Sequence, residues 1–589
     1  MVGLPNLCNG ERGFCAPRAM VGLPKLCNGE RVVVFLFVSR IVFFAPIHLA
    51  FEAAALCLLA VASLLTEISL ENSAALDRFK TRSGAASGIL LASITLPSLM
   101  LSRMVQMSRS LPNIEIGPQG FTHFSLHFWA ACSGCFTVVC ILQFLVQYWR
   151  RNMISFQLLW SQAFRFSLVN LVVYGIICSL SFSRKSSSGW YVIMNLIWHF
   201  FNGLATIILL KHVLCTFPSC ASIGEALLVS SGLVLYFGDV LVRSLLKMTW
   251  TSESPNFDFH ERGSRSEIST IIQGLLVGLI IFPLFYKATL QVLKLTNIFK
   301  ANVQVDGWMP KGTGRSIVFY ASLLVMVTAV VPAWMHFVED FPVYPLVWIL
   351  EFLFEVPLQR IVLCTYWISI ILLSIVRFYN ISKHNKTERI LLRKYYHLVA
   401  VLMFVPALIF EPDFLDLAFG TALAVFIVLE MIRVWQILPF GNMVHQFMNA
   451  FTDHRDSEIL VVSHFSLLLG CAIPKWMSSG FNDRPLAPFA GILSLGIGDT
   501  MASMVGHKYG VLRWSKTGKK TIEGTAAGIT SVLASCSVLL PLLASTGFIL
   551  SQHWLSLVMA VTVTGLLEAY TTQLDNAFIP LVFYSLLCL

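Results

Sequence analysis

Residues 496–528 read GIGDTMASMVGHKYGVLRWSKTGKKTIEGTAAG, and one apolar segment leads into this stretch while another leads out of it. Asp499 stands near the end of the first segment, directly behind Gly496 and Gly498. An ionisable residue inside an apolar span indicates a functional site by default. Glycine allows a backbone to approach a phosphate closely, so the stretch predicts a phosphate site at a membrane surface.

The loop that joins the two apolar segments is basic. Its cationic residues are Lys508, Arg513, Lys516, Lys519 and Lys520, and the next segment opens with Thr521, Glu523 and Gly524. A helix N-terminus and lysines attract phosphate, and a carboxylate can share Mg2+ with it. A basic loop is also typical of a simple topology signal. It is not a Walker A loop, because that motif requires glycine where this chain has Arg513.

Two motifs in this region resemble the signature of the CTP-dependent lipid kinases. They are Gly496-x-Gly498-Asp499-Thr500-x-Ala502-Ser503 and Lys519-Lys520-Thr521-x-Glu523-Gly524-Thr525. The group includes dolichol, phytol and CTP-type diacylglycerol kinases and is related to phosphatidate cytidylyltransferases. The resemblance covers about the last third of the chain. It implies that the basic loop binds CTP, that Asp499 is a ligand of Mg2+ or another divalent cation, and that the γ-phosphoryl group passes to a lipid hydroxyl.

The composition places the whole chain in a membrane. Of the 589 residues, 56% are hydrophobic and 12% are charged, whereas about 25% are charged in soluble proteins. Apolar stretches near the spanning length of about 20 residues recur along the chain. They predict an all-α, polytopic transmembrane bundle of roughly fifteen spans. The net charge of +10 is assigned to loops at the membrane rather than to nucleic acid, because no basic soluble domain is present.

Three regions follow along the chain. Residues 1–31 contain the duplication MVGLPNLCNGER and MVGLPKLCNGER, to which we assign no role. Residues 32–378 form an N-terminal multi-span region, and residues 379–589 form the C-terminal lipid kinase region that carries the motifs. Phytol and diacylglycerol kinases resemble the C-terminal region alone. The long N-terminal region therefore favours the dolichol kinases, with dolichol and membrane lipids as partners.

Four polar clusters of the C-terminal region are predicted to meet on one membrane face. Counting spans from a basic linker at 380–394 places it on the same side as loops 439–457, 507–520 and 570–576, and the Lys/Arg excess marks this side as cytosolic. The additional cluster residues are Arg393, Lys394, His397, Ser503, Asp453, Arg455, Asp456, Glu568, Asp575 and Asn576. Asp499, Asp575 and Glu568 are the predicted catalytic carboxylates, and the resemblance implies the endoplasmic reticulum membrane.

Other polar residues inside spans have simpler interpretations. Glu430 and Arg433, which we also predict as supporting residues of the kinase site, lie three residues apart, so they share a helix face and can pair. Glu225, Asp239 and Glu351 are predicted to make polar contacts between helices. A Cys-x-x-Cys pair at 132–135 has no second pair, which favours helix packing over zinc.

Two alternatives to dolichol phosphorylation remain at this point. One is a kinase of phytol or diacylglycerol. The other is a transporter whose broken helix at Gly496–Asp499 binds an anion, although the first half of the chain has no second Gly-x-Gly-Asp. The choice of CTP over ATP is implied by the resemblance alone.

Overall fold

The computed structural model describes the larger part of the chain. The described residues are 28–72, 81–82, 85–110, 118–150, 169, 172–184, 189–250, 266–295, 313–384, 389–449, 462–478, 484–514, 520–545 and 554–589.

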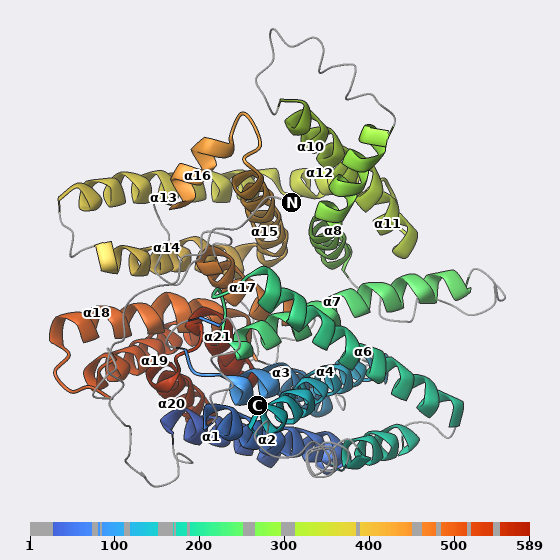
Figure 1. Cartoon of the computed structure of the whole chain (residues 1–589). Helices are drawn as coiled ribbons and strands as arrows, with labels where there is room; N and C mark the ends of the chain where they lie inside the picture. Colours follow the sequence, from blue (N-terminus) through green and yellow to red (C-terminus); the bar gives the residue numbers. More distant parts are fainter. Residues whose placement is uncertain are drawn as a thin grey trace, which may run out of the picture.

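The described residues fold into helices (Figure 1). The first half contains α1 (Gly29–Phe44), α2 (Ala50–Glu71), α3 (Ile89–Ser110), α4 (Pro118–Arg150), α6 (Gly189–Thr216), α7 (Ile223–Trp250) and α8 (Glu267–Leu295). The middle contains α10 (Thr313–Val325), α11 (Val331–Val338), α12 (Pro345–Glu355), α13 (Pro357–His384), α14 (Arg389–Phe410), α15 (Pro412–Trp435) and α16 (Gly441–Asn449). The last part contains α17 (Val462–Met477), α18 (Thr500–Tyr509), α19 (Ile522–Ser545), α20 (Trp554–Tyr570) and α21 (Asp575–Leu587). The described residues form no strand, and their isolated bridge joins Arg513 to Thr521.

The lengths of these helices confirm the predicted class. Ten helices of the described chain are long and apolar enough to cross a membrane, and five shorter apolar helices accompany them. Many large side chains on their outer faces are exposed, such as Phe35, Leu373 and Leu555, which are 70%, 72% and 75% accessible. Such exposed apolar faces fit a lipid environment. The protein is therefore a polytopic helical membrane protein, as the composition predicts.

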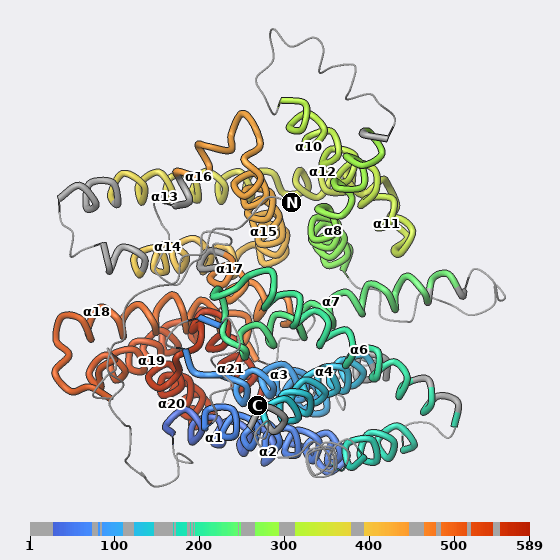
Figure 2. Tube along the Cα trace, viewed as in Figure 1, coloured from blue at the N-terminus to red at the C-terminus, as the bar shows by residue number. Residues whose placement is uncertain are grey.

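The first and last parts of the chain share one packed core. In Figure 2 the blue helices α1 and α3 lie beside the red helices α20 and α21, and α20 runs against α1. Helix α21 packs on α3 and on α17, and a single cluster of buried apolar residues extends through both regions. The helices of region 32–378 are therefore part of the structural support of region 379–589.

The apolar segment that leads to Asp499 differs from a regular helix. A 3₁₀ turn at Ala487–Phe489 is followed by a π-helical segment, η6 (Ile492–Asp499), which then continues into α18. Glycine lowers helix propensity, and Gly496 and Gly498 lie inside the π-helical part. π-helical turns occur frequently at functional sites, and this one ends at Asp499.

The basic linker predicted at 380–394 is largely helical. Helix α13 runs on to His384, and α14 already begins at Arg389. Lysine, arginine and leucine are good helix formers, so charge at this position does not interrupt the helices. By contrast, a break does occur at Pro357, because α12 ends at Glu355 and α13 begins at the proline.

The end of the duplicated segment has a structural role that the sequence did not reveal. Most of residues 1–31 lie outside the described residues, but α1 begins at Gly29. The Arg31 guanidinium bonds to the Glu67 and Glu71 carboxylates of α2 at 2.9 and 2.8 Å. The adjacent Glu30 accepts a hydrogen bond of 3.5 Å from Thr571, in the loop between α20 and α21.

Candidate active site

Asp499 lies at the centre of a buried polar cluster formed by η6, α14 and α18. Its side chain is 3% exposed and forms an ion pair with the Lys394 ammonium. His397 Nδ1 lies 3.3 Å from Asp499 Oδ2 and 3.2 Å from the Leu495 carbonyl oxygen. Both neighbours are acceptors, so this ring nitrogen carries the hydrogen. Ser503, one turn along α18, donates to Asp499 Oδ1 at 3.5 Å.

The cluster extends from Asp499 to the C-terminal helices. Lys520, just before α19, donates to the Glu568 carbonyl oxygen on α20. The Lys394 ammonium interacts electrostatically with Asp499, Asp575 and Glu568, and Lys520 attracts the Glu568 carboxylate. Three carboxylates and two ammonium groups from separate elements therefore share one site. The structure thus places residues of three of the four polar clusters near one another, and their role as one kinase site stays a prediction.

Helices α18 and α19 approach each other along a seam of small residues. A methyl group on Gly524 would lie 2.6 Å from the Ala502 carbonyl oxygen, and one on Gly528 would lie 3.0 Å from the Gly498 carbonyl oxygen. Gly498 and Ala502 are four residues apart, as are Gly524 and Gly528, so each helix presents its small residues on one face. This close approach joins the Asp499 segment to the helix that follows Lys520. Gly496, on the other side of η6, packs against Val401 of α14.

Thr521, Glu523 and Gly524 organise the start of α19. The Thr521 hydroxyl accepts the Gly524 N–H at 3.2 Å, which is the arrangement of a helix N-cap. The Glu523 carboxylate accepts the Leu512 N–H at 2.9 Å and thereby closes the loop. In this structure the Thr521 and Glu523 side chains both shape the loop. Their predicted contribution to nucleotide binding would be made through the conformation of this loop.

The remaining cations of the loop point to solvent. Lys508 is exposed, and its ammonium lies 5.1 Å from the centre of the Tyr509 ring. Arg513 is also exposed and forms the backbone bridge to Thr521. Neither side chain belongs to the buried cluster around Asp499. Lys516 and Lys519 lie outside the described residues.

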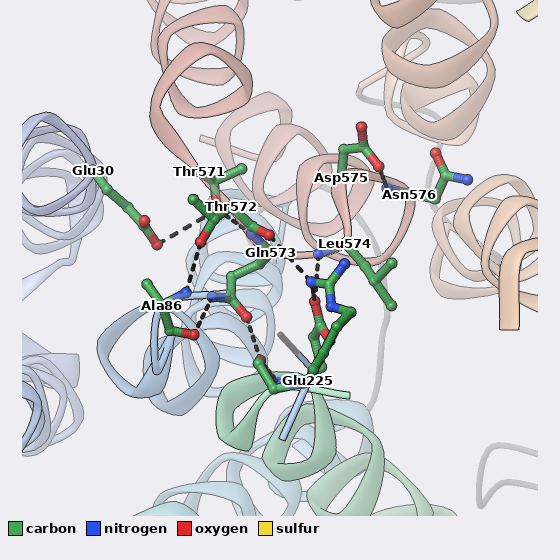
Figure 3. Close-up of polar contacts among 11 residues, drawn as sticks. Glu30, Ala86, Glu225, Thr571, Thr572, Gln573, Leu574, Asp575 and Asn576 are labelled. Atoms are coloured by element: carbon green, nitrogen blue, oxygen red, sulfur yellow. Dashed lines mark hydrogen bonds and ion pairs between the residues drawn. The ribbon is translucent and has the colours of Figure 1, made fainter. Parts of the chain in front are cut away.

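The loop between α20 and α21 is held by helices of the N-terminal region (Figure 3). Gln573 is 2% exposed; its amide donates to the Ala86 carbonyl at 3.0 Å and its oxygen accepts from Ser222. The Leu574 N–H donates to the Glu225 carboxylate at 2.8 Å. Asp575 follows this loop directly, and Glu568 precedes it. The loop therefore fixes the positions of two predicted catalytic carboxylates.

Comparison with known proteins places this site in a family. The model of the family "Dolichol kinase" matches residues 193–540. The chain is 55% identical over 562 residues to dolichol kinase EVAN of Arabidopsis thaliana, covering 95% of this chain and 98% of that protein. It is 34% identical over 387 residues to the human dolichol kinase, covering 63% and 65% of the two chains. This chain belongs to the dolichol kinase family. No solved structure matches it.

Membership of the dolichol kinase family confirms the kinase interpretation and leaves the phytol, diacylglycerol and transporter alternatives without support. The chain is a kinase whose acceptor is a polyprenol lipid. The matched residues extend across the predicted boundary at 378–379, in agreement with the shared core.

The other predicted residues of the kinase site occupy different positions. Glu430 and Arg433 form the predicted pair, buried within α15, with a distance of 2.7 Å. The described partners of Asp499 do not include this pair. The Asn576 N–H donates to the Asp575 carboxylate at 3.2 Å. Arg393 lies in α14, but its side chain is outside the described residues, as are Asp453, Arg455 and Asp456.

Sequence reasoning missed the supports of the kinase loop. Glu225 was predicted to make a contact between helices, but its partners Arg82 and the Leu574 N–H lie in loops. Gln573 gave no signal, because an uncharged residue in a short polar turn is unremarkable without its partners. Glu351, for which a polar contact between helices was also predicted, is exposed on α12.

Proposed function

We propose that this kinase transfers the γ-phosphoryl group of CTP to dolichol, with Mg2+, at the cytosolic face of the endoplasmic reticulum membrane. The observation that carries the proposal is the convergence of Asp499, Glu568 and Asp575 with Lys394 and Lys520 in one cluster. Phosphoryl transfer depends on positioning and on neutralising charge rather than on covalent chemistry of the protein. This cluster supplies both signs of charge at one place.

The lysines are the proposed phosphate ligands. Lys394 and Lys520 come from different elements and lie on either side of the carboxylates. Lys519, next to Lys520 in the sequence, adds a further charge. When a triphosphate enters, its oxygens compete with Asp499 for Lys394. His397 then continues to hold Asp499, because its hydrogen bond does not depend on the lysine.

The donor set of the cluster fits a divalent cation. Magnesium prefers oxygen ligands and is usually bound through one or two carboxylates together with substrate phosphates. The cluster offers three carboxylates, and Asp499 Oδ1 faces the weak Ser503 bond rather than the lysine. Asp499 is the proposed first ligand, and Asp575 is the second. When bound, the cation would neutralise charge on the β- and γ-phosphates.

Glu568 is the proposed acceptor of the lipid proton. It lines a cavity of about 20 Å³ between η6, α19, α20 and α21, together with Thr525 and Thr564. The lining of this cavity includes Glu568 and no described lysine, so a lipid hydroxyl that reaches it meets this carboxylate. The oxygen of the lipid hydroxyl forms a bond to the γ-phosphorus of CTP. The bond from the γ-phosphorus to the bridging oxygen breaks, and CDP leaves. The hydroxyl proton passes to the carboxylate, as general base catalysis requires.

The proposal is tested with membranes that contain the expressed protein. Labelled CTP and labelled ATP are offered in parallel to dolichol, phytol and diacylglycerol, with and without a chelator. The expected product is labelled dolichyl phosphate, formed from CTP and lost on chelation. Labelling from ATP alone would contradict the donor, and turnover unaffected by the chelator would contradict the cation. Glu568→Gln should retain CTP binding, measured by photo-crosslinking, and lose turnover.

A further inference from the structure

Two histidines of α4 and one aspartate of α7 meet far from the kinase site. His123 and His127 are four residues apart and therefore share a helix face. Their Nε2 atoms lie 2.9 Å apart, and they lie 3.1 and 3.4 Å from Asp239 Oδ1. We propose that these three side chains bind a divalent transition-metal ion of the zinc class, which joins α4 to α7.

Hydrogen bonding to an ionised Asp239 cannot make all three contacts of this triangle favourable at once. With Asp239 ionised, each histidine needs a hydrogen on Nε2 to bond to the carboxylate. If both nitrogens carry a hydrogen, the two N–H groups face each other at 2.9 Å. If one of the two Nε2 atoms lacks a hydrogen, the lone pair of that nitrogen faces the Asp239 carboxylate oxygen. A cation is the partner that makes all three contacts favourable at once.

The distances match the edges of a metal coordination polyhedron. Zinc bonds to histidine nitrogen and carboxylate oxygen are about 2.0–2.2 Å long, which separates neighbouring ligands by about 3.0 Å in octahedral and about 3.4 Å in tetrahedral geometry. The three observed distances fall close to this range. A point about 2.0 Å from all three atoms exists roughly 1 Å outside their plane, so bonds of zinc length require almost no movement.

The surroundings provide the support that metal sites require. The Gln273 amide of α8 donates to Asp239 Oδ2 at 2.7 Å and so fixes the carboxylate. Such outer hydrogen bonds orient metal ligands. The cluster also opens into a cavity of about 60 Å³, lined in part by Trp198 and Asn202, which has room for water. Water in this cavity supplies the remaining ligand positions.

The site lies toward the membrane face opposite the kinase cluster. The Gly224 N–H at the start of α7 bonds to the Ser87 carbonyl at 2.8 Å, beside the loop that holds Asp575. Asp239 follows Ile223 by roughly 24 Å of helix, which is most of the hydrocarbon thickness of about 30 Å. His123 begins the candidate span His123–Val146. The proposed ion is therefore separate from any cation at Asp499.

The test uses the full-length protein in detergent, stripped of metal by a chelator. Zinc is titrated in the presence of excess Mg2+, because imidazole ligands select zinc while the carboxylates of the kinase site favour Mg2+. Bound zinc is measured by elemental analysis after gel filtration. We expect one tightly bound zinc ion per protein molecule. This zinc should be lost in the variants His127→Asn and Asp239→Asn. Gln273→Ala should weaken the affinity by roughly 10–100-fold.

Two controls keep the result interpretable. His212→Asn, at an exposed histidine of α6, should retain the equivalent of zinc. X-ray absorption on the zinc-loaded natural protein should show imidazole ligands, and this measurement does not require any variant to fold. Equal zinc binding by the natural protein and by both cluster variants would overturn the proposal. So would a spectrum with oxygen ligands alone, or no tight zinc at all.

Discussion

Replacing Asp499 by asparagine should separate the chemistry of the site from its stability. The substitution is nearly isosteric and removes one charge, but it leaves Lys394, whose side chain is 12% exposed, without its buried partner. Breaking a buried ion pair in this way costs about 3–5 kcal/mol of folding free energy. Asp499→Asn should therefore lose activity and also lower the free energy of unfolding by about that amount.

A second substitution tests whether the loss of stability comes from the Lys394 charge. Lys394→Met in the Asp499→Asn background removes the unpaired charge, and replacing both members of a buried pair by neutral groups is often neutral or stabilising. The double variant should recover stability, measured by unfolding in mixed micelles, without recovering activity. Phosphorylation of dolichol is measured in membranes at saturating divalent cation, after normalising for protein. Near-normal turnover by Asp499→Asn, or restored turnover in the double variant, would refute the central role of this carboxylate.

Three further predictions address the surroundings of the site. Lys519→Ala combined with Lys520→Ala should raise the Michaelis constant for the nucleotide, lower turnover, or both; unchanged nucleotide kinetics would reduce the loop to a topology signal. Gln573→Ala should lower stability by about 1–3 kcal/mol, because it leaves buried partners unsatisfied, and should reduce activity through the displaced loop. A variant with natural thermal stability would argue against this anchoring. The N-glycosylation sequences at Asn380 and Asn385 should remain unmodified if the 380–394 linker faces the cytosol together with the 507–520 loop. An acceptor sequence engineered just before α20 should instead be glycosylated. An endoglycosidase shift at either natural sequence would contradict the sidedness.

The helical membrane class and the centre of the site could be predicted from the sequence. Apolar runs of spanning length are a strong local signal, and Asp499 stands out because a carboxylate within such a run is expensive. Counting spans was enough to bring Lys394 to the same side as Asp499. These inferences depend on charge and periodicity, which are written along the chain.

Other features depend on contacts that no local pattern encodes. The π-helical course of Ile492–Asp499 follows from how its glycines pack against neighbouring helices, and a hydropathy pattern describes it as an ordinary span. The anchoring of Gln573 by Ala86 and Ser222 joins residues that are far apart in sequence. The cluster of His123 and Asp239 was invisible for the same reason, since each residue alone resembles an ordinary polar contact.

The seam between α18 and α19 has a consequence for the interpretation of inherited sequence variants in such kinases. Gly524 and Gly528 bear no side chain, yet an added methyl at Gly524 would collide with a backbone oxygen that cannot rotate away. A glycine-to-alanine change here, among the mildest in the genetic code, should behave as a loss-of-function allele. A substitution at the exposed Lys508 changes charge and shape far more, yet it should leave the activity nearly unchanged.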